Sequence, residues 1–287
     1  MNFLALCARL AGNELVAAEC ENLTGGKPEE DGFTLCRSVE LIDRGAYVHT
    51  GVRLIAQAAT FDDLLKSVQG LSFPAERFRI EHRRLALQKR MSSRQAVISL
   101  ANVIPAYPDL NAPEHRFLLI ERKSGIWFGE ILAESSHSYR QHDHKPYRTS
   151  SSLPSRMARA LVNLVSPPAR SILDPCCGTG SILLEAQALG VEAYGVKNLA
   201  YFGYSAEVIL ADIRELKRVA EAVVTDLPYG LWMHEDPRDI RAIIQRILYL
   251  APVTVFVAGE DLSGWLQEIG CQRVEVFRVY KHIDFCR

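Results

Sequence analysis

LDPCCGTGSILLEA, residues 173–186, joins a short apolar segment to a helical pattern through a small, polar loop that contains two glycines. The residues up to Asp174 predict the end of a buried strand, and those after Gly180 predict a helix that ends at Gly190. Gly178 and Gly180 can adopt positive φ angles and let the backbone approach a ligand closely. The helix N-terminus that follows favours an anionic group. The loop is therefore a candidate binding site at the end of a strand.

The loop does not match the two best-known phosphate-binding patterns. Leu183 stands where the dinucleotide fingerprint has its third glycine, and the lysine of a P-loop is absent. Asp174 before the turn favours a ligand that carries an ammonium group or hydroxyl groups over one that carries phosphates. Taken alone, the strand-loop-helix pattern is weak support for binding, because close packing explains such glycines about as often.

The residues around this loop predict an α/β domain. Strand and helix patterns alternate along the C-terminal half, which indicates a doubly wound parallel sheet. The last segment, 271–282, alternates with period two and predicts a strand at the sheet edge. The other predicted strands are 191–196, 206–212, 221–226 and 252–259, and the predicted helix among them is 237–250.

The N-terminal half has the pattern of an α+β module. It combines helical segments, a basic strand and a hairpin that turns at Lys123–Gly125. Thr60 caps one predicted helix, and Ser92 or Ser93 caps another. Residues 135–154 are polar and poor in strand-forming residues, which predicts a linker. The expected domains are 1–134 and 155–287, with 135–154 between them.

A second loop motif, TDLPYG at residues 225–230, follows another predicted strand. Together with DPCCGTGSILLEA it resembles the catalytic and cofactor loops of S-adenosylmethionine-dependent amino-methyltransferases. KPYRTSSSLPSRMARALVNLV, residues 145–165, resembles the helix before the cofactor loop in THUMP-domain tRNA guanosine-N2-methyltransferases. VYKHIDFCR, residues 279–287, is similar to the last strand of that family. The N-terminal half resembles the THUMP region of the family more loosely.

The resemblance implies a Rossmann-like class I methyltransferase domain preceded by an α+β THUMP-like RNA-binding module. It also implies S-adenosyl-L-methionine as the cofactor and tRNA as the partner. The implied cofactor-binding residues are Asp174, Pro175, Cys176, Gly178, Thr179, Gly180, Asp212 and Ile213. The implied catalytic residues are Asp226, Leu227, Pro228 and Tyr229.

The TDLPYG motif suits methyl transfer to an exocyclic amine. The lone pair of guanine N2 is delocalised into the ring, so the amino group needs orientation. Asp226 and a backbone carbonyl at Leu227 or Pro228 would accept hydrogen bonds from it, and Tyr229 would stack on the flipped-out base. A turn that only closes a strand is the alternative explanation. Leu227 replaces the family's usual first proline, so the carbonyl is less preorganised.

The rest of the implied cofactor pocket departs further from the family. Asp212 would accept a hydrogen bond from the adenine amino group and Ile213 would pack on the ring, although Asp212 could instead cap a helix. Lys197 follows Val196 where the family has an acid, and the link to Ser205 is short for a parallel crossover. Either part of the pocket is missing or a segment is absent from this sequence. We favour the second, which predicts a Val196–Lys197 Cα separation far above ~3.8 Å.

The densest basic stretch, residues 77–94, lies in the N-terminal half. Lysine and arginine contacts to phosphate supply most non-specific affinity for nucleic acid. The resemblance implies that Arg83, Arg84, Lys89 and Arg90 form a patch that grips tRNA. A solvated charged face is the alternative explanation.

Composition favours a globular protein. Its 287 residues are 48% hydrophobic with a formal net charge of −1, which argues against disorder. No apolar run approaches the ~20 residues of a membrane helix, and the start lacks the basic region of a signal peptide. Seven scattered cysteines without a CxxC pair predict reduced thiols in a cytoplasmic protein. No metal is expected, because no carboxylate or thiol cluster accompanies His137, His142 and His144.

Three functional hypotheses follow. The first is an enzyme that makes N2-methylguanosine in tRNA. The second is a catalytically impaired RNA-binding protein that keeps the fold, and the shortened region after Val196 motivates it. The third is a methyltransferase that acts on rRNA or on adenine N6 of DNA, because the preference for tRNA rests on the resemblance alone. Calorimetry with S-adenosylmethionine separates the second hypothesis from the others.

Overall fold

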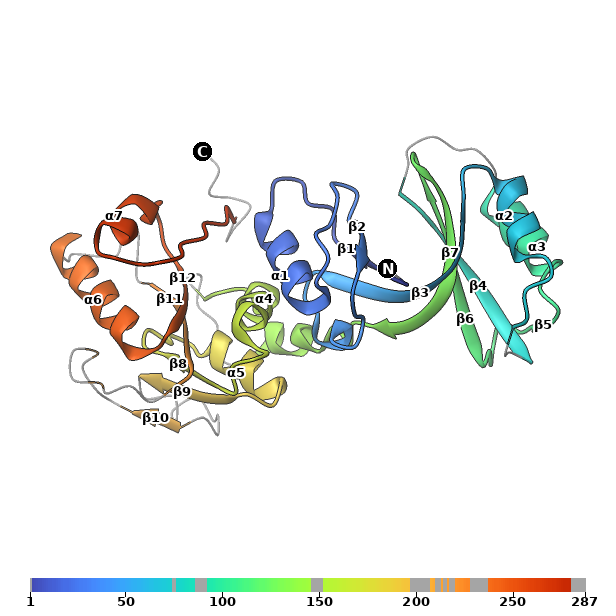
Figure 1. Cartoon of the computed structure of the whole chain (residues 1–287). Coiled ribbons are helices and arrows are strands. Elements are labelled where there is room, and N and C mark those ends of the chain that lie inside the picture. The colour runs from blue at the N-terminus through green and yellow to red at the C-terminus, as the bar shows by residue number, and fades with distance from the viewer. Residues whose placement is uncertain are drawn as a thin grey trace. The chain divides into compact units, whose positions relative to one another are not determined.

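The chain forms two compact units in a computed structural model (Figure 1). Unit one comprises Met1–Ala11, Cys20–Asp43 and Val48–Ser135, and unit two comprises Gly12–Glu19, Arg44–Tyr47 and Ser136–Arg287. The chain passes between units within the helix α1 (Glu14–Thr24) and the 3₁₀ helix η1 (Ile42–Arg44). The structure describes residues 2–73, 76–85, 92–145, 152–196, 207–209, 213, 216, 220–227 and 237–279.

Unit one is built on a seven-stranded sheet with the order β2-β1-β3-β7-β6-β4-β5. The strand β4 runs parallel to β6 and β5, and the other neighbouring strands are antiparallel. The helices α2 (Phe61–Val68) and α3 (Ser93–Ala101) cover one face of this sheet (Figure 1). The strands are β1 (Phe3–Cys7), β2 (Phe33–Cys36), β3 (Val48–Ala58), β4 (Arg77–Arg84), β5 (Tyr107–Pro108), β6 (His115–Arg122) and β7 (Gly125–Glu134).

Local sequence signals account for the helices and the hairpin of unit one. The Thr60 hydroxyl accepts a hydrogen bond from the Asp63 N–H, and Ser92 caps α3 in the same way. Both predicted N-caps are therefore confirmed. The predicted hairpin is also confirmed, because β6 and β7 pair in antiparallel register up to Arg122 and Gly125. Apolar side chains of α2 and α3 pack on the sheet residues Phe78, Ile80, Phe117, Leu119, Ile126 and Phe128.

Unit two contains a five-stranded sheet with the order β10-β9-β8-β11-β12. All neighbouring strands run parallel. In chain order this is 3-2-1-4-5, the order of a Rossmann-like doubly wound sheet. The predicted α/β fold class is thus confirmed. The strands are β8 (Ser171–Asp174), β9 (Glu192–Val196), β10 (Glu207–Ile209), β11 (Ala222–Asp226) and β12 (Val253–Val257).

Helices cover both faces of this sheet (Figure 1). The helices α4 (Ser155–Val165) and α5 (Ser181–Ala188) pack on one face, and α6 (Pro237–Leu250) and α7 (Ser263–Glu268) pack on the other. Neighbouring strand residues point to opposite faces, so Ile172 joins the first core and Leu173 joins the second. This burial on both faces explains why the strands are apolar throughout rather than alternating.

Two segments of unit two differ from the sequence prediction or extend it. The described part of the predicted edge strand, 271–279, has no strand structure; its Arg278 N–H donates a hydrogen bond of 2.9 Å to the Glu14 carboxylate. The prediction of a strand there is wrong for these residues, because period-two alternation produces a strand only where a neighbour pairs with it. Within the segment predicted as a linker, Ser138–His144 forms the 3₁₀ helix η2, whose Tyr139 is buried.

Across the described residues, no helix is both long enough and apolar enough to cross a membrane.

Candidate functional site

Two aspartates lie at one edge of the sheet in unit two. Neighbouring strands β8 and β11 run parallel, with Ile172 opposite Ala222 and Leu173 opposite Val223. Asp174 ends β8 and Asp226 ends β11. The carboxyl ends of the strands in an open α/β sheet are where ligands bind. The two strand ends that carry the quoted motifs therefore lie at the same edge of the sheet.

The loop after β8 has the backbone geometry of a ligand cradle. Gly178 and Gly180 adopt positive φ angles of 49° and 77°, which side chains with a Cβ atom rarely tolerate. Among the described residues, a Cβ atom at Gly178 would meet only the Cys176 carbonyl oxygen, 3.9 Å away. The helix α5 begins at Ser181 without a side-chain cap. Its first-turn N–H groups thus suit an anionic group of a ligand.

Thr225 connects this loop to β11. Its hydroxyl donates a hydrogen bond of 2.7 Å to Asp174 Oδ1. The Cys176 N–H lies 3.2 Å from the same carboxylate oxygen and 3.3 Å from Thr225 Oγ1, so it donates to both. Thr225 and Asp174 are buried, with 0% and 1% of their surface exposed. The carboxylate, hydroxyl and amide therefore form a closed triangle beneath the loop.

The environment of Asp174 favours its protonated form. The net pKa of its carboxyl group is raised from 3.8 to about 7, chiefly by burial, and the nearby charge of Asp226 also contributes to this rise. The hydrogen bonds from Thr225 and from the Cys176 N–H oppose this rise, because they stabilise the carboxylate. Asp174 is therefore balanced between its two protonation states near neutral pH.

Residues upstream of α4 hold the far end of the loop. Lys145 Nζ donates hydrogen bonds of 3.0 Å to Thr179 Oγ1 and 2.5 Å to Ser181 Oγ. The hydroxyl groups of Ser152 and Thr179 are 2.9 Å apart, and Ser181 Oγ donates to the Leu153 carbonyl at 2.9 Å. The loop is thus fixed at the Asp174 end by β11 and at the Thr179 end by the chain before α4.

Sequence analysis did not single out Thr225, Lys145 or Ser152. All three lie inside the motifs quoted there, at positions 145–165 and 225–230. Their position inside these motifs was the available signal that they belong to the site. Their hydrogen-bond partners could not be predicted, because these depend on strand register and packing, which the sequence does not show. Pro175, Cys176 and Thr179 lie in the loop between β8 and α5, and their role in cofactor binding stays a prediction.

The other predicted site residues are described only in part. The Leu227 side chain is buried in the core beside α6, and its N–H donates to the Val257 carbonyl at 3.1 Å. Ile213 packs against the same core. Asp212, Pro228, Tyr229 and Lys197 lie outside the described residues, and so does the predicted Val196–Lys197 separation.

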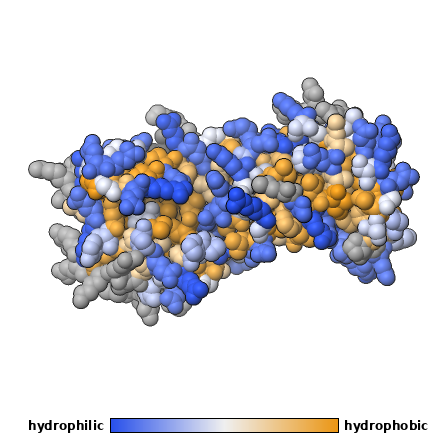
Figure 2. All heavy atoms as spheres, viewed as in Figure 1, coloured by the Kyte–Doolittle hydropathy of each residue, from blue (hydrophilic) through white to orange (hydrophobic). Residues whose placement is uncertain are grey.

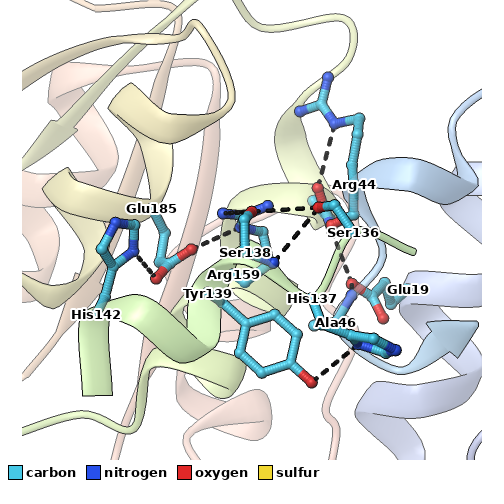
Figure 3. Close-up of polar contacts among 11 residues, drawn as sticks. Glu19, Arg44, Ala46, Ser136, His137, Ser138, Tyr139, His142, Arg159 and Glu185 are labelled. Carbon is cyan, nitrogen blue, oxygen red and sulfur yellow. Dashed lines mark hydrogen bonds and ion pairs between the residues drawn. The ribbon is translucent and has the colours of Figure 1, made fainter. Parts of the chain in front are cut away.

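An ionic network centred on the buried Glu185 lies between η2, α4 and α5 (Figure 3). Glu185 of α5 accepts a hydrogen bond of 2.6 Å from Arg159 Nε of α4, and His142 Nδ1 of η2 lies 2.6 Å from its other oxygen. Arg159 also donates to the Ser138 hydroxyl at 3.2 Å. The network therefore ties η2, α4 and α5 together.

The predicted RNA-binding residues differ from one another. Arg83 is exposed and forms no ion pair within the described residues. Arg84 instead donates to the buried Glu121 carboxylate at 2.9 Å. Several other arginines of unit one also pair with acids, among them Arg53, Arg77, Arg116 and Arg122. Hydrophilic side chains are spread over the visible surface rather than gathered in one block (Figure 2). Lys89 and Arg90 lie outside the described residues.

Metal and disulfide sites are not found in the described part of the chain. None of its groups of histidine, cysteine, aspartate and glutamate could hold a metal ion. Of the three linker histidines, His142 faces Glu185, and His137 Nδ1 lies 3.5 Å from the Tyr139 hydroxyl. The cysteines in these ranges form no disulfide.

The comparison with protein families agrees with this architecture. Residues 142–208 match a family described as RMKL-like, methyltransferase domain. The match begins in η2, contains the Asp174 loop and ends in β10. Unit two is thus a Rossmann-like α/β domain, and the part of it from β8 into β10 lies within the match to this methyltransferase-domain family.

Among characterised proteins, the chain is similar to tRNA (guanine(10)-N2)-dimethyltransferases. It is 34% identical to that of Pyrococcus abyssi, over 37% of this chain and 38% of the relative. It is 30% identical to that of Methanothermobacter thermautotrophicus, over 66% of this chain and 62% of the relative. The chain thus spans less than two thirds of the length of these relatives. Among solved structures, TrmN from Thermus thermophilus has a TM-score of 0.48 at 20% identity, over 87% of this chain and 84% of that one.

Proposed function

We propose that the protein transfers a methyl group from S-adenosyl-L-methionine to the exocyclic N2 of a guanosine in tRNA. One observation carries the proposal: Asp174 and Asp226 end two adjacent parallel strands and are joined through Thr225. A cofactor loop and a base-binding loop must lie side by side for such a transfer. The similarity to tRNA (guanine(10)-N2)-dimethyltransferases supports the choice of substrate.

The residues of the first loop fit this cofactor. When bound, S-adenosylmethionine would supply an electrophilic methyl group on its sulfonium. Its carboxylate suits the uncapped N-terminus of α5, and its ammonium and hydroxyl groups suit the polar loop from Asp174 to Gly180. Within this proposal Pro175, Cys176 and Thr179 line the pocket, and Asp212 and Ile213 hold the adenine.

The second loop would orient the base. Asp226 accepts a hydrogen bond from the amino group, holds the N2 lone pair toward the methyl group, and can accept the proton that N2 releases. When the bound cofactor supplies its methyl group to N2, Asp226 would accept the proton that N2 releases. The backbone carbonyl at Leu227 or Pro228 would accept the second amino hydrogen, and Tyr229 would stack on the ring.

Unit one would act as a THUMP-like RNA-binding module in the cytoplasm. Its seven-stranded sheet with α2 and α3 on one face has the α+β character expected of such a module. Arg83 is the described residue best suited to a phosphate, because its side chain is exposed and carries no ion pair in the described residues. Lys89 and Arg90 would extend this contact, whereas Arg84 already holds Glu121.

The direct test is to identify the modified nucleoside. Bulk tRNA incubated with the protein and methyl-labelled cofactor should yield labelled N2-methylguanosine or N2,N2-dimethylguanosine by mass spectrometry. Parallel incubations with rRNA and DNA test the alternative substrates. Asp226→Ala should abolish transfer and leave tRNA affinity unchanged. Label found in rRNA, or in N6-methyladenine of DNA, would show that the substrate is not tRNA. The absence of S-adenosylmethionine binding in calorimetry would favour an impaired RNA-binding protein.

A further inference from the structure

Thr225 lies one residue before Asp226, and both hydrogen-bonding capacities of its hydroxyl reach the other loop. The hydroxyl donates to Asp174 at 2.7 Å and accepts from the Cys176 N–H at 3.3 Å. We propose that Thr225 is a positioning residue that couples the cofactor loop to the base-binding loop. This inference rests on the proposed function, because it assigns Thr225 a task between the two loops of that site.

The backbone around Asp226 is fixed from both sides. On one side Thr225 is tied to the loop after β8. On the other side the Leu227 N–H donates to the Val257 carbonyl of β12 at 3.1 Å, and the Leu227 side chain is buried beside α6. Asp226 is therefore held between two anchors one residue away on either side. A shift of the cofactor loop would reach Asp226 through the Thr225 anchor, because the Leu227 anchor is built into the core.

A hydroxyl is needed at this position for a specific reason. The Cys176 N–H sits between two acceptors, and Asp174 Oδ1 receives two donors. Valine has the shape of threonine but can neither donate nor accept. Thr225→Val would leave a buried carboxylate with one donor fewer and an amide with one acceptor fewer. Because valine fills the same volume, losing these hydrogen bonds should change the position of the loop after β8 but not the packing around residue 225.

The electrostatics of the triangle give a readout that a packing role does not. The Thr225 hydrogen bond lowers the pKa of Asp174 against the opposing effects of burial and of Asp226. Asp226 is the charged neighbour that raises the pKa of Asp174. Removing the hydroxyl should therefore raise the pKa of Asp174, and Thr225→Ser should restore it. A substitution that only loosened the sheet would let water reach Asp174 and lower its pKa instead.

The experiment compares four full-length proteins: wild type, Thr225→Val, Thr225→Ser and Thr254→Val. Thr254 of β12 is the matched control, because its buried hydroxyl has no hydrogen-bond partner in the described residues. The first readouts use protein without added cofactor: hydrogen exchange of the Cys176 amide and NMR titration of the Asp174 carboxyl carbon. The second is the affinity for S-adenosylhomocysteine by calorimetry.

We expect Thr225→Val to speed exchange of the Cys176 amide, to raise the Asp174 titration midpoint and to weaken S-adenosylhomocysteine binding by about tenfold. Thr225→Ser and Thr254→Val should behave like wild type. Unchanged exchange and midpoint in Thr225→Val would overturn the positioning role. If wild type binds S-adenosylhomocysteine, and Thr225→Val speeds exchange of the Cys176 amide without weakening that binding, the coupling between the two loops would be overturned.

Failure of the proposed function has a different signature. If wild type binds no S-adenosylhomocysteine, the coupling to a cofactor is overturned together with the proposed function. The cofactor-free exchange and titration data would still decide whether Thr225 positions the loop. The two failures are therefore distinguishable within one set of proteins.

Discussion

Arg159 of α4 and Glu185 of α5 form an ion pair of 2.6 Å in the interior of unit two. Only 2% and 0% of their side-chain surfaces are exposed. A buried ion pair contributes little net stability, but the loss of one partner leaves a buried charge uncompensated. Because α4 precedes β8 and α5 begins where the loop from Asp174 to Gly180 ends, this pair holds together the two helices that flank that loop in the chain.

Arg159→Met should therefore destabilise the protein strongly. Methionine keeps much of the apolar stem of arginine but leaves Glu185 with His142 as its remaining polar partner in the network of Figure 3. We expect the free energy of unfolding to fall by about 3–5 kcal/mol in urea denaturation. Arg170→Met, at an exposed arginine of the same unit, should change it by less than about 0.5 kcal/mol.

The double variant Arg159→Met, Glu185→Leu separates charge from packing. Replacing both buried charges with apolar side chains should recover most of the lost stability. If the double variant were as unstable as Arg159→Met alone, the packing of the arginine stem, and not the unpaired carboxylate, would explain the loss.

Glu19 should be a second point of high sensitivity. Its buried carboxylate accepts hydrogen bonds from the N–H groups of Ala46 and Tyr47 at 2.8 and 2.6 Å, and from Asn163 at 2.7 Å. Glu19→Ala takes this acceptor from two buried donors and from the partly buried Tyr47 N–H, so the free energy of unfolding should fall by about 3 kcal/mol. Glu21→Ala, at an exposed position of α1, is the control in the same urea measurement. Equal midpoints for the two variants would show that water replaces the carboxylate.

The raised pKa of Asp174 predicts how stability depends on pH. The folded protein holds this proton more tightly than the unfolded chain, with a pKa of about 7 against 3.8. The stabilisation of the protonated form is therefore present below pH 4 and lost as pH rises through 7. At 1.36 kcal/mol per unit, the loss is at most about 4 kcal/mol by pH 8.

Asp174→Asn should remove this dependence. The amide oxygen can still accept from Thr225 and the Cys176 N–H, and the side chain cannot ionise. In urea denaturation at pH 5 and pH 8, wild type should lose stability relative to the variant as pH rises. Asp62→Asn, at an exposed acid of α2, should leave the wild-type slope intact. The reverse slope would mean that the folded state favours the ionised carboxylate.

Arg83 and Arg84 show what the sequence can predict and what it cannot. Both stand in one basic stretch, and composition treats them alike. Strand alternation sends their side chains to opposite faces of β4, and the register with β6 places Arg84 opposite Glu121. The sequence predicted the strand, because its pattern is local. It could not predict the ion pair, because the partner is 37 residues away.

The same division holds in unit two. The strand ends at Asp174 and Asp226 and the helix after Gly180 were predictable, because apolar runs and glycines mark them locally. The Thr225 triangle was not, because it depends on how β8 and β11 pair. Residues 271–279 show the opposite case. Their alternating pattern predicts a strand, but they pair with no strand in the described residues and form none.

The two arginines should consequently respond differently to substitution. Arg84→Met removes a charged hydrogen bond from the buried Glu121 and should cost about 1.5–3 kcal/mol of stability. Arg83→Met should leave stability unchanged. If unit one binds tRNA as proposed, the same change should weaken tRNA binding and reduce its salt dependence by about one phosphate contact. Urea denaturation and tRNA titrations at several salt concentrations measure both. If Arg83→Met left affinity and salt slope as in wild type, the basic stretch would be a solvated face.

Lys145 provides the last test, of the loop's far end. Its ammonium group donates to Thr179 and Ser181, where α5 begins, and so adds a cation to a helix N-terminus. If the carboxylate of the proposed cofactor lies there, Lys145→Met should weaken S-adenosylhomocysteine binding by about tenfold or more. The affinity for 5′-methylthioadenosine, which lacks the amino-acid part, should change much less. Lys123→Met, at the exposed hairpin turn, is the matched control in calorimetry. An equal loss for both ligands would mean that Lys145 shapes the whole loop, and no loss for either would remove it from the site.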